Sequence, residues 1–164
     1  ELLIRLKARG IISAEYLGMP EKTIETWRDL WFHTGDGLRR DAEGWYYFVD
    51  RVKDALRRRG ENISSFEVES GVRSHPAVAD CAVVGVRADE AGGEDEVMAC
   101  VVLKDGETAA AEDICAWAEK ELPAFMVPRY IDFITELPQT ATEKVRKKVL
   151  RERGVTETTW DRLA

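Results

Sequence analysis

A charged, apolar-poor segment, Asp50–Glu67, constrains the fold of this chain more than any other feature. It follows a run of aromatic residues and a valine, 45–49, that is typical of a strand, and a helix can begin at Ser64 near its end. A segment of this composition that contains a glycine does not belong in a core. It predicts a charged connector that bends, followed by a tight exposed loop. The chain is therefore expected to change its structural character here.

Residues 1–50 are predicted to be β-rich. Asp41–Gly44 have turn-forming composition directly before the run 45–49, which predicts a hairpin. This part has too little alternating apolar surface to close a core of its own. Because the chain opens at Glu1 without a methionine and continues directly into apolar residues, we expect a fragment of a longer protein.

Residues 51–164 are predicted to form an α+β unit, a three-stranded sheet with packed helices. Continuous apolar runs at 79–86 and 97–103 favour strands that are covered on both faces, and a third strand is expected at 130–134. The expected helices begin at a Ser64–Glu67 capping box, at an N-cap Thr108 and at about Lys144, and the last of them ends at Gly154.

Composition and charge narrow the function classes. With 45% hydrophobic residues and five tryptophans the chain is expected to have a core, and a net charge of −7 argues against nucleic acid as the main partner. Cys81, Cys100 and Cys115 lie in apolar runs without a CxxC pair, which predicts buried free thiols in a reducing compartment. His33 and His75 have no carboxylate or cysteine at ligand spacing, so no metal site on the protein is predicted. Since no apolar stretch reaches the roughly 18 residues of a membrane span and no signal peptide is visible, a cytoplasmic protein is expected.

Asp36 and Arg51 are the first candidates for ligand binding. The carboxylate of Asp36, which follows a glycine, can accept two hydrogen bonds from a vicinal diol such as that of a ribose. The alternative for an isolated Thr-Gly-Asp is a turn aspartate. Arg51 lies at the end of the next expected strand, so a hairpin would let both residues face one ligand that carries a sugar and a phosphate.

Lys144 lies at the tip of an expected exposed loop, residues 137–144. A mobile point charge there can lower the repulsion between two reacting anions, and a solvated lysine is the alternative. The run Arg57–Arg59 is a solvated face by default, but beside Gly60 it can meet a phosphate-bearing ligand.

Four motifs in order resemble the C-terminal part of the adenylate-forming superfamily, which includes acyl-CoA synthetases, luciferases and the adenylation domains of peptide synthetases. The resemblance covers nearly all of the sequence, and four motifs at compatible spacings are a specific signal where one alone is not. The four segments are Trp31–Asp36, Phe48–Asp54, Gly60–Ser64 and Pro138–Lys144.

The resemblance implies a domain arrangement and a nucleotide site. Residues 1–50 would be the C-terminal strands of a large N-terminal adenylation domain, and residues 51–164 a small C-terminal lid domain. By the same resemblance Asp36 would bind the ATP ribose, Arg51 would contact the nucleotide and Lys53 would be the hinge.

The resemblance also implies a two-step reaction that uses ATP, CoA and Mg²⁺, the metal being bound with ATP mostly by the missing domain. A carboxylic acid would attack the α-phosphate of ATP, and the CoA thiol would then displace AMP from the acyl-adenylate. Lys144 would be the catalytic residue of the first step, and Gly60, with Arg57 beside it, would belong to the cofactor-binding loop of the second. We expect the fragment without its N-terminal domain to be inactive.

Glu143 departs from the family pattern, which usually has glycine before the catalytic lysine. This brings into question any backbone conformation that only glycine adopts. If the segment is extended, neighbouring side chains point apart and Glu143 need not pair with Lys144. Together with residues 57–62, Glu143 most resembles carnitine/crotonobetaine-type CoA ligases.

Two alternatives to an acid–CoA ligase remain. The adenylate could be passed to a carrier-protein thiol or another acceptor, or the chain could be a non-catalytic interaction module that retains the lid fold. The acid is not identified, because the acyl pocket lies in the missing domain. An oligomer is possible, since unpaired strands of residues 1–50 can pair with another copy.

Overall fold

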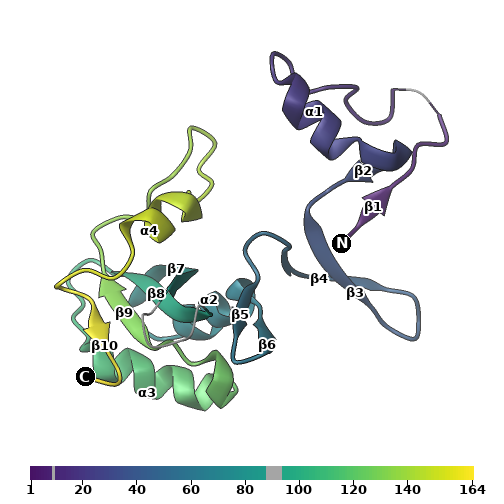
Figure 1. The fold of residues 1–164 in the computed structure, drawn as a ribbon. Coiled ribbons are helices and arrows are strands. Elements are labelled where there is room, and N and C mark those ends of the chain that lie inside the picture. The colour runs from purple at the N-terminus through teal and green to yellow at the C-terminus, as the bar shows by residue number, and fades with distance from the viewer. Residues whose placement is uncertain (9, 88–93) are drawn as a thin grey trace. The chain divides into compact units, whose positions relative to one another are not determined.

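The structure, a computed structural model, describes residues 1–8, 10–87 and 94–164. The chain divides into two compact units, Glu1–Lys53 and Asp54–Ala164 (Figure 1). The sequence placed the change of structural character three residues earlier, after residue 50.

The first unit contains two small antiparallel ladders. The predicted hairpin is confirmed: Asp41 Oδ1 accepts the backbone N–H groups of Glu43 and Trp45, and Gly44 has a positive φ of 98°. The aromatic side chains of its second strand remain exposed. The elements are β1 (Leu3–Ile4) paired with β2 (Phe32–His33), α1 (Pro20–Thr26), a 3-10 turn (Arg28–Leu30), and β3 (Asp36–Arg40) paired with β4 (Tyr46–Arg51).

The second unit is built on a four-stranded sheet of order β10-β9-β8-β7. The strands β8 and β9 are parallel, and the other two pairs are antiparallel. A small hairpin, β5 with β6, precedes the sheet. The elements are β5 (Leu56–Arg58), β6 (Glu61–Ile63), α2 (Ser65–Arg73), β7 (Val78–Arg87), β8 (Asp95–Leu103), α3 (Ala111–Glu121), β9 (Tyr130–Phe133), α4 (Lys147–Arg153) and β10 (Trp160–Asp161).

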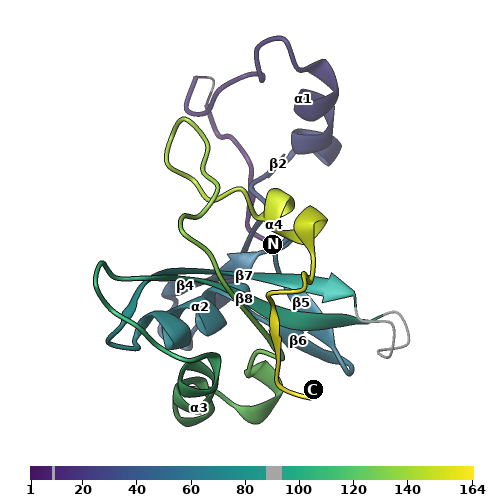
Figure 2. The same cartoon turned by 90° about the vertical axis from the view of Figure 1, so that its left-hand side faces the viewer.

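Apolar side chains cover both faces of this sheet. On one face α2 and α3 pack on the larger core cluster, which includes Val68, Val72 and Ile114. On the other face Leu137 and Leu150, the latter from α4, pack on Val84 and other strand residues. Figure 2 shows α2 and α3 on one side of the strands and α4 on the other. The continuous apolar runs of β7 and β8 are thus explained by a sheet that is covered twice.

The predicted α+β class is confirmed, but the three-stranded sheet is wrong in detail. The fourth strand, β10, has only two residues, and so short a segment shows no strand period in the sequence. The Ser64 cap is confirmed, since its Oγ accepts the N–H of Glu67 at 3.2 Å. The cap predicted at Thr108 is wrong, because α3 begins only at Ala111, where the Asp113 carboxylate accepts the N–H of Ala110.

The last helix begins later than the sequence predicted. It starts at Lys147 rather than at Lys144, because the backbone of the preceding residues is used in a turn. Its predicted end is confirmed at Gly154, whose φ is 63°. The three cysteines are free and buried, as expected. Within the described residues, each helix is too short or too polar to cross a lipid bilayer.

Candidate functional site

The Thr34-Gly35-Asp36 segment of the first unit holds its aspartate in place through the backbone. The hydroxyl of Thr34 donates to the Leu2 carbonyl at 2.8 Å and accepts the Asp36 N–H at 3.1 Å. Gly35 has a φ of 75°, a left-handed conformation that favours glycine, and its carbonyl accepts the N–H of Val52. These bonds attach the segment to β1 and to the end of β4, so the Asp36 backbone is fixed on two sides.

Asp36 and Arg51 form an ion pair. They are directly opposite each other in the β3–β4 ladder, and Arg51 Nε lies 2.8 Å from Asp36 Oδ1. Both side chains keep access to solvent, and Arg51 lines a cavity of 360 Å³ together with Gly35 and Lys53. The hairpin therefore brings together the two residues that sequence reasoning assigned to one ligand.

Glu1 and His33 support this segment, and sequence reasoning gave neither a role there. Glu1 Oε1 accepts the N–H of Gly35 at 2.9 Å, and its other oxygen lies 2.9 Å from His33 Nδ1. The hydrogen bond from His33 lowers the pKa of the Glu1 carboxyl. The two residues are 32 positions apart, so only the pairing of β1 with β2 brings them together.

Lys53 is the last residue of the first unit. It is exposed and lines the same 360 Å³ cavity as Arg51. The hinge role assigned to it therefore stays a prediction.

The Gly60 loop of the second unit is a two-residue turn between β5 and β6. Arg58 pairs with Glu61 across the hairpin, while Arg59 and Gly60 have φ values of 52° and 81°. Two positive φ values in a two-residue hairpin loop indicate a type I′ turn. A Cβ atom at Gly60 would meet no other atom within 4 Å, so the space above this turn is open.

The three arginines before Gly60 have different environments. Arg58 is committed to the protein: its Nε lies 2.7 Å from Glu96 Oε2, and its Nη1 donates to two backbone carbonyls at 3.2 Å. Burial lowers the pKa of Arg58, and Glu96 opposes that effect. Arg57 is exposed and forms no ion pair with any residue that the structure describes. Of the run, Arg57 and Arg59 thus remain available to an outside ligand.

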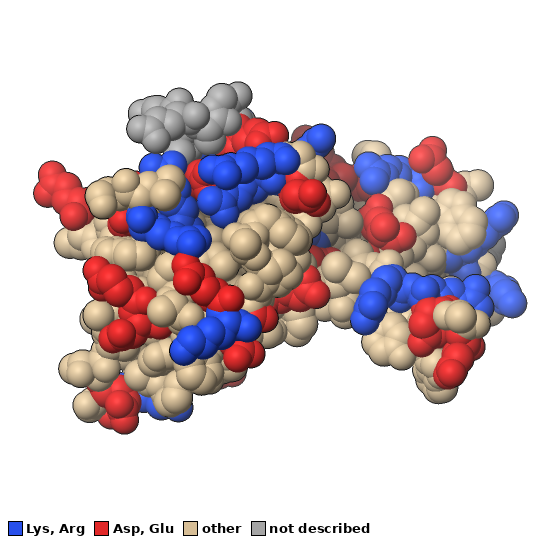
Figure 3. Space-filling model, turned by 90° about the horizontal axis from the view of Figure 1, so that it is seen from below, with Lys and Arg blue, Asp and Glu red and all other residues tan. Residues whose placement is uncertain are grey.

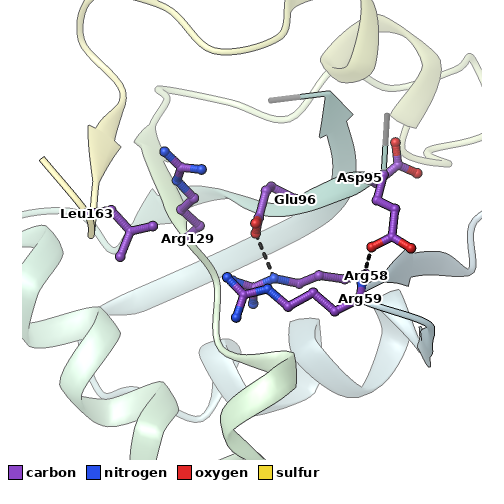
Figure 4. A pocket seen from close by; sticks show the side chains of 7 residues that line it. Arg58, Arg59, Asp95, Glu96, Arg129 and Leu163 are labelled. Carbon is purple, nitrogen blue, oxygen red and sulfur yellow. Dashed lines mark hydrogen bonds and ion pairs between the residues drawn. The ribbon is translucent and has the colours of Figure 1, made fainter. Parts of the chain in front are cut away.

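A polar cavity of 300 Å³ lies beside this turn (Figure 4). Its charges are largely paired: Arg58 with Glu96, and Arg129 with Asp161 through two bonds of 3.0 Å. These bonds raise the pKa of Arg129 and lower that of Asp161. The lining residues are Arg58, Arg59, Glu94, Asp95, Glu96, Arg129 and Leu163.

Lys144 stands at the end of a tight hairpin. The N–H of Glu143 donates to the Thr140 carbonyl, and the N–H of Thr140 donates to the Lys144 carbonyl. The hydroxyl of Thr140 accepts the Lys144 N–H at 3.2 Å. The Lys144 side chain is exposed, and it forms no ion pair within the described part of the chain. The predicted exposed presentation of this lysine is confirmed.

Glu143 occupies the position of this hairpin that favours glycine. Its φ is 59°, in the left-handed region, directly after the turn that Thr140 closes. A turn followed by one left-handed residue is a common three-residue hairpin loop, and glycine is its usual third residue. The expectation of an extended segment at Glu143 is therefore wrong. Glu143 and Lys144 nevertheless form no ion pair in the described structure.

Charges are otherwise distributed over the surface. On the face shown in Figure 3, Lys and Arg side chains are interspersed with Asp and Glu. Within the ranges 1–8, 10–87 and 94–164, no three His, Cys, Asp or Glu residues are grouped so that they could hold a metal ion.

Comparisons with known proteins identify the second unit. Residues 67–144 match the model of the AMP-binding enzyme C-terminal domain. The medium-chain acyl-CoA ligase ACSF2, mitochondrial, of Bos taurus is 42% identical over 138 residues, which are 84% of this chain and 22% of that protein. The crotonobetaine/carnitine–CoA ligase of Proteus sp. (strain LE138) is 40% identical over 154 residues, which are 92% of this chain and 29% of that protein.

A solved structure agrees with these relatives. The crystal structure of the anthranilate CoA ligase AuaEII in complex with anthranoyl-AMP matches with a TM-score of 0.80 and 32% sequence identity. The match covers 93% of this chain and 29% of that one. The chain therefore spans less than a third of each of these proteins, and the part that it shares with them includes the AMP-binding enzyme C-terminal domain, matched at residues 67–144.

Proposed function

We propose that this chain is the C-terminal part of an AMP-forming acid–CoA ligase. In this proposal residues 1–50 are the last strands of a large N-terminal domain, and residues 51–164 are a lid that serves two reactions in turn. The complete enzyme converts a carboxylic acid, ATP and CoA into acyl-CoA, AMP and pyrophosphate. The chain alone is inactive, because the phosphate loop and the acyl pocket belong to the missing domain.

The first unit supplies the nucleotide-binding residues. Asp36 fits a ribose diol, because a carboxylate with a fixed backbone can accept two hydrogen bonds from adjacent hydroxyl groups. Its partner Arg51, 2.8 Å away, orients the carboxylate and can turn toward a phosphate. Mg²⁺ is bound together with ATP, mostly by residues of the missing domain. Lys53 is the last residue of the first unit, directly before the boundary between the two units, and we assign the hinge to it.

The second unit supplies a residue for each half-reaction. Lys144 lies close to the acid carboxylate and the α-phosphate during adenylation, where its positive charge stabilises the developing negative charge. Gly60 faces the CoA thiol arm in the second half-reaction, because this glycine has no side chain that could block the approach. Arg57, exposed on the same hairpin, is free to bind a CoA phosphate.

Lys144, which is exposed and has no ion-pair partner among the residues that the structure describes, lies on a hairpin with a defined backbone and carries this proposal. The test is a half-reaction experiment in the longer enzyme that contains this chain. We expect Lys144→Ala to reduce adenylation, measured as acid-dependent pyrophosphate exchange, by about 100- to 1000-fold. It should still convert supplied acyl-adenylate and CoA to thioester at the wild-type rate.

Two further variants complete this experiment. Lys148→Ala removes a nearby exposed lysine and should leave both half-reactions unchanged. Lys53→Pro stiffens the assigned hinge and should slow one half-reaction more than the other. Equal losses of both half-reactions in Lys144→Ala would contradict the assignment of Lys144 to the first step.

The acceptor and the acid are separate parts of the proposal. The relatives are named as CoA ligases, which favours CoA over a carrier protein. CoA-dependent release of AMP decides between them. The acid is to be identified by pyrophosphate exchange with a panel that includes medium-chain acids and carnitine. A cytoplasmic location and the possible oligomer stay predictions.

A further inference from the structure

Glu69 connects the two faces of the sheet at its β7 edge. In the order β10-β9-β8-β7, strand β7 is an outer strand, so the N–H groups on its free side need other partners. One of them, the N–H of Val83, donates to Glu69 Oε1 at 2.9 Å. Glu69 belongs to α2, on the face of the larger core cluster, and its side chain is only 10% exposed.

Lys147 reaches the same carboxylate from the opposite face. It is the first residue of α4, and its Nζ lies 2.7 Å from Glu69 Oε1 and 2.7 Å from the Ser65 hydroxyl. Figure 2 shows α2 and α4 on opposite sides of the strands, and both helices contact β7. The pair Glu69–Lys147 therefore attaches the start of α4 to α2 around the strand edge.

This ion pair matters because α4 has little apolar attachment. Leu150 is its one buried residue among the seven. Ion pairs of Arg151 with Asp54 and of Arg153 with Asp132 attach the C-terminal half of the helix. Glu69 is thus the charged partner that, together with the Ser65 hydroxyl, fixes its first turn.

The first turn of α4 is directly connected to the Lys144 hairpin. Lys147 lies three residues after Lys144, and the N–H of Arg146 donates to the Pro138 carbonyl at 2.7 Å. Val145 closes the hairpin by bridging to Gln139. A displacement of Lys147 is therefore transmitted through two residues to Lys144.

From these contacts we propose that Glu69 is a positioning residue for Lys144. It touches neither substrate nor reacting atoms, and it acts by fixing Lys147 and with it the base of the catalytic hairpin. The inference rests on the proposed function. A small displacement of a group that must approach two anions is costly, since an error of about 1 Å can lower a rate 100-fold.

The test compares Glu69→Gln with Glu152→Gln in the longer enzyme. Glutamine at position 69 can still accept the Val83 N–H but no longer carries the charge that Lys147 needs. Glu152 is the matched control, because it pairs with Lys148 at 3.5 Å on the exposed side of the same helix. We expect Glu69→Gln to lower kcat for pyrophosphate exchange by about 10- to 100-fold with KM for ATP within about twofold. Thioester formation from supplied acyl-adenylate should not change.

Two measurements separate positioning from a loss of folding. The double variant Glu69→Gln/Lys147→Met should be no worse than Glu69→Gln, because the two residues then act as one unit. Hydrogen exchange of a peptide that covers residues 138–146 should become faster in Glu69→Gln and not in Glu152→Gln. Hydrogen exchange in α3 should be equal in all variants, because the fold of the second unit is then unchanged.

The outcomes distinguish this inference from the proposed function. If Lys144→Ala loses adenylation but Glu69→Gln keeps it, or if Glu69→Gln slows both half-reactions equally, the positioning role is refuted and the function stands. If the wild-type enzyme shows no pyrophosphate exchange with any acid, the proposed function fails. In that case the positioning role of Glu69 is still testable, because unchanged hydrogen exchange of residues 138–146 in Glu69→Gln would refute it.

Discussion

Glu143 gives the sharpest test of the backbone reasoning. A residue with a side chain costs about 1–2 kcal/mol in the left-handed region relative to the right-handed one, and Glu143 has a φ of 59°. Glycine avoids this cost but loses more backbone entropy on folding, about 0.5–1 kcal/mol. We therefore expect Glu143→Gly to increase the free energy of unfolding of the second unit by roughly 0.5–1 kcal/mol.

The assay is a urea titration followed by two indole N–H signals in NMR spectra. Trp117 donates to Ser74 at 2.8 Å and Trp160 donates to Glu112 at 2.9 Å, so both signals report on the second unit alone. With a urea m-value of about 2 kcal/mol/M, the midpoint should rise by about 0.3–0.5 M.

The control is Glu143→Ala, which removes the charge but keeps a side chain at the same φ. We expect its free energy of unfolding to stay within about 0.5 kcal/mol of the wild-type value. If alanine stabilises as much as glycine, the effect belongs to the charge of Glu143 and the argument from φ is wrong. A lower midpoint for Glu143→Gly would refute it as well.

Two further predictions concern the core. Burial raises the pKa of the Cys100 thiol to about 11 and also raises the pKa values of the Cys81 and Cys115 thiols. The native protein at about pH 8 should therefore not react with a thiol reagent within minutes. In urea all three cysteines should react. Rapid labelling of a native thiol would contradict this burial. A Cβ atom added at Gly85 would lie 2.5 Å from Leu56 Cδ2 and 2.9 Å from Asp95 Oδ2. Gly85→Ala should therefore lower the free energy of unfolding by about 1–3 kcal/mol in the same urea titration, and an unchanged midpoint would show that Leu56 can move aside.

Several local features of the second unit were readable in the sequence because each depends on local chemistry. The Ser64 cap, the glycine turn at position 60 and the end of α4 at Gly154 are decided by residues within a few positions of each other. That Asp36 and Arg51 lie close together could be anticipated for a related reason, although their ion pair was not predicted. Once the turn at Asp41–Gly44 is recognised, a hairpin brings its two ends together.

Contacts between distant segments could not be read in this way. The last strand, β10, is defined only by pairing with β9, because two residues have no period of their own. The support of Gly35 by Glu1 depends on the pairing of β1 with β2.

The sequence by itself determined the AMP-binding C-terminal domain, the order of the motifs and the identity of the exposed lysine, because motif chemistry and hydrophobic period are properties of consecutive residues. Only the tertiary structure decided that Glu143 takes a left-handed conformation and that Glu69 meets Lys147 around the edge of β7. The physical reason is that a hydrogen bond or an ion pair depends on distance in space, and packing brings these two residues together across 78 positions of the chain.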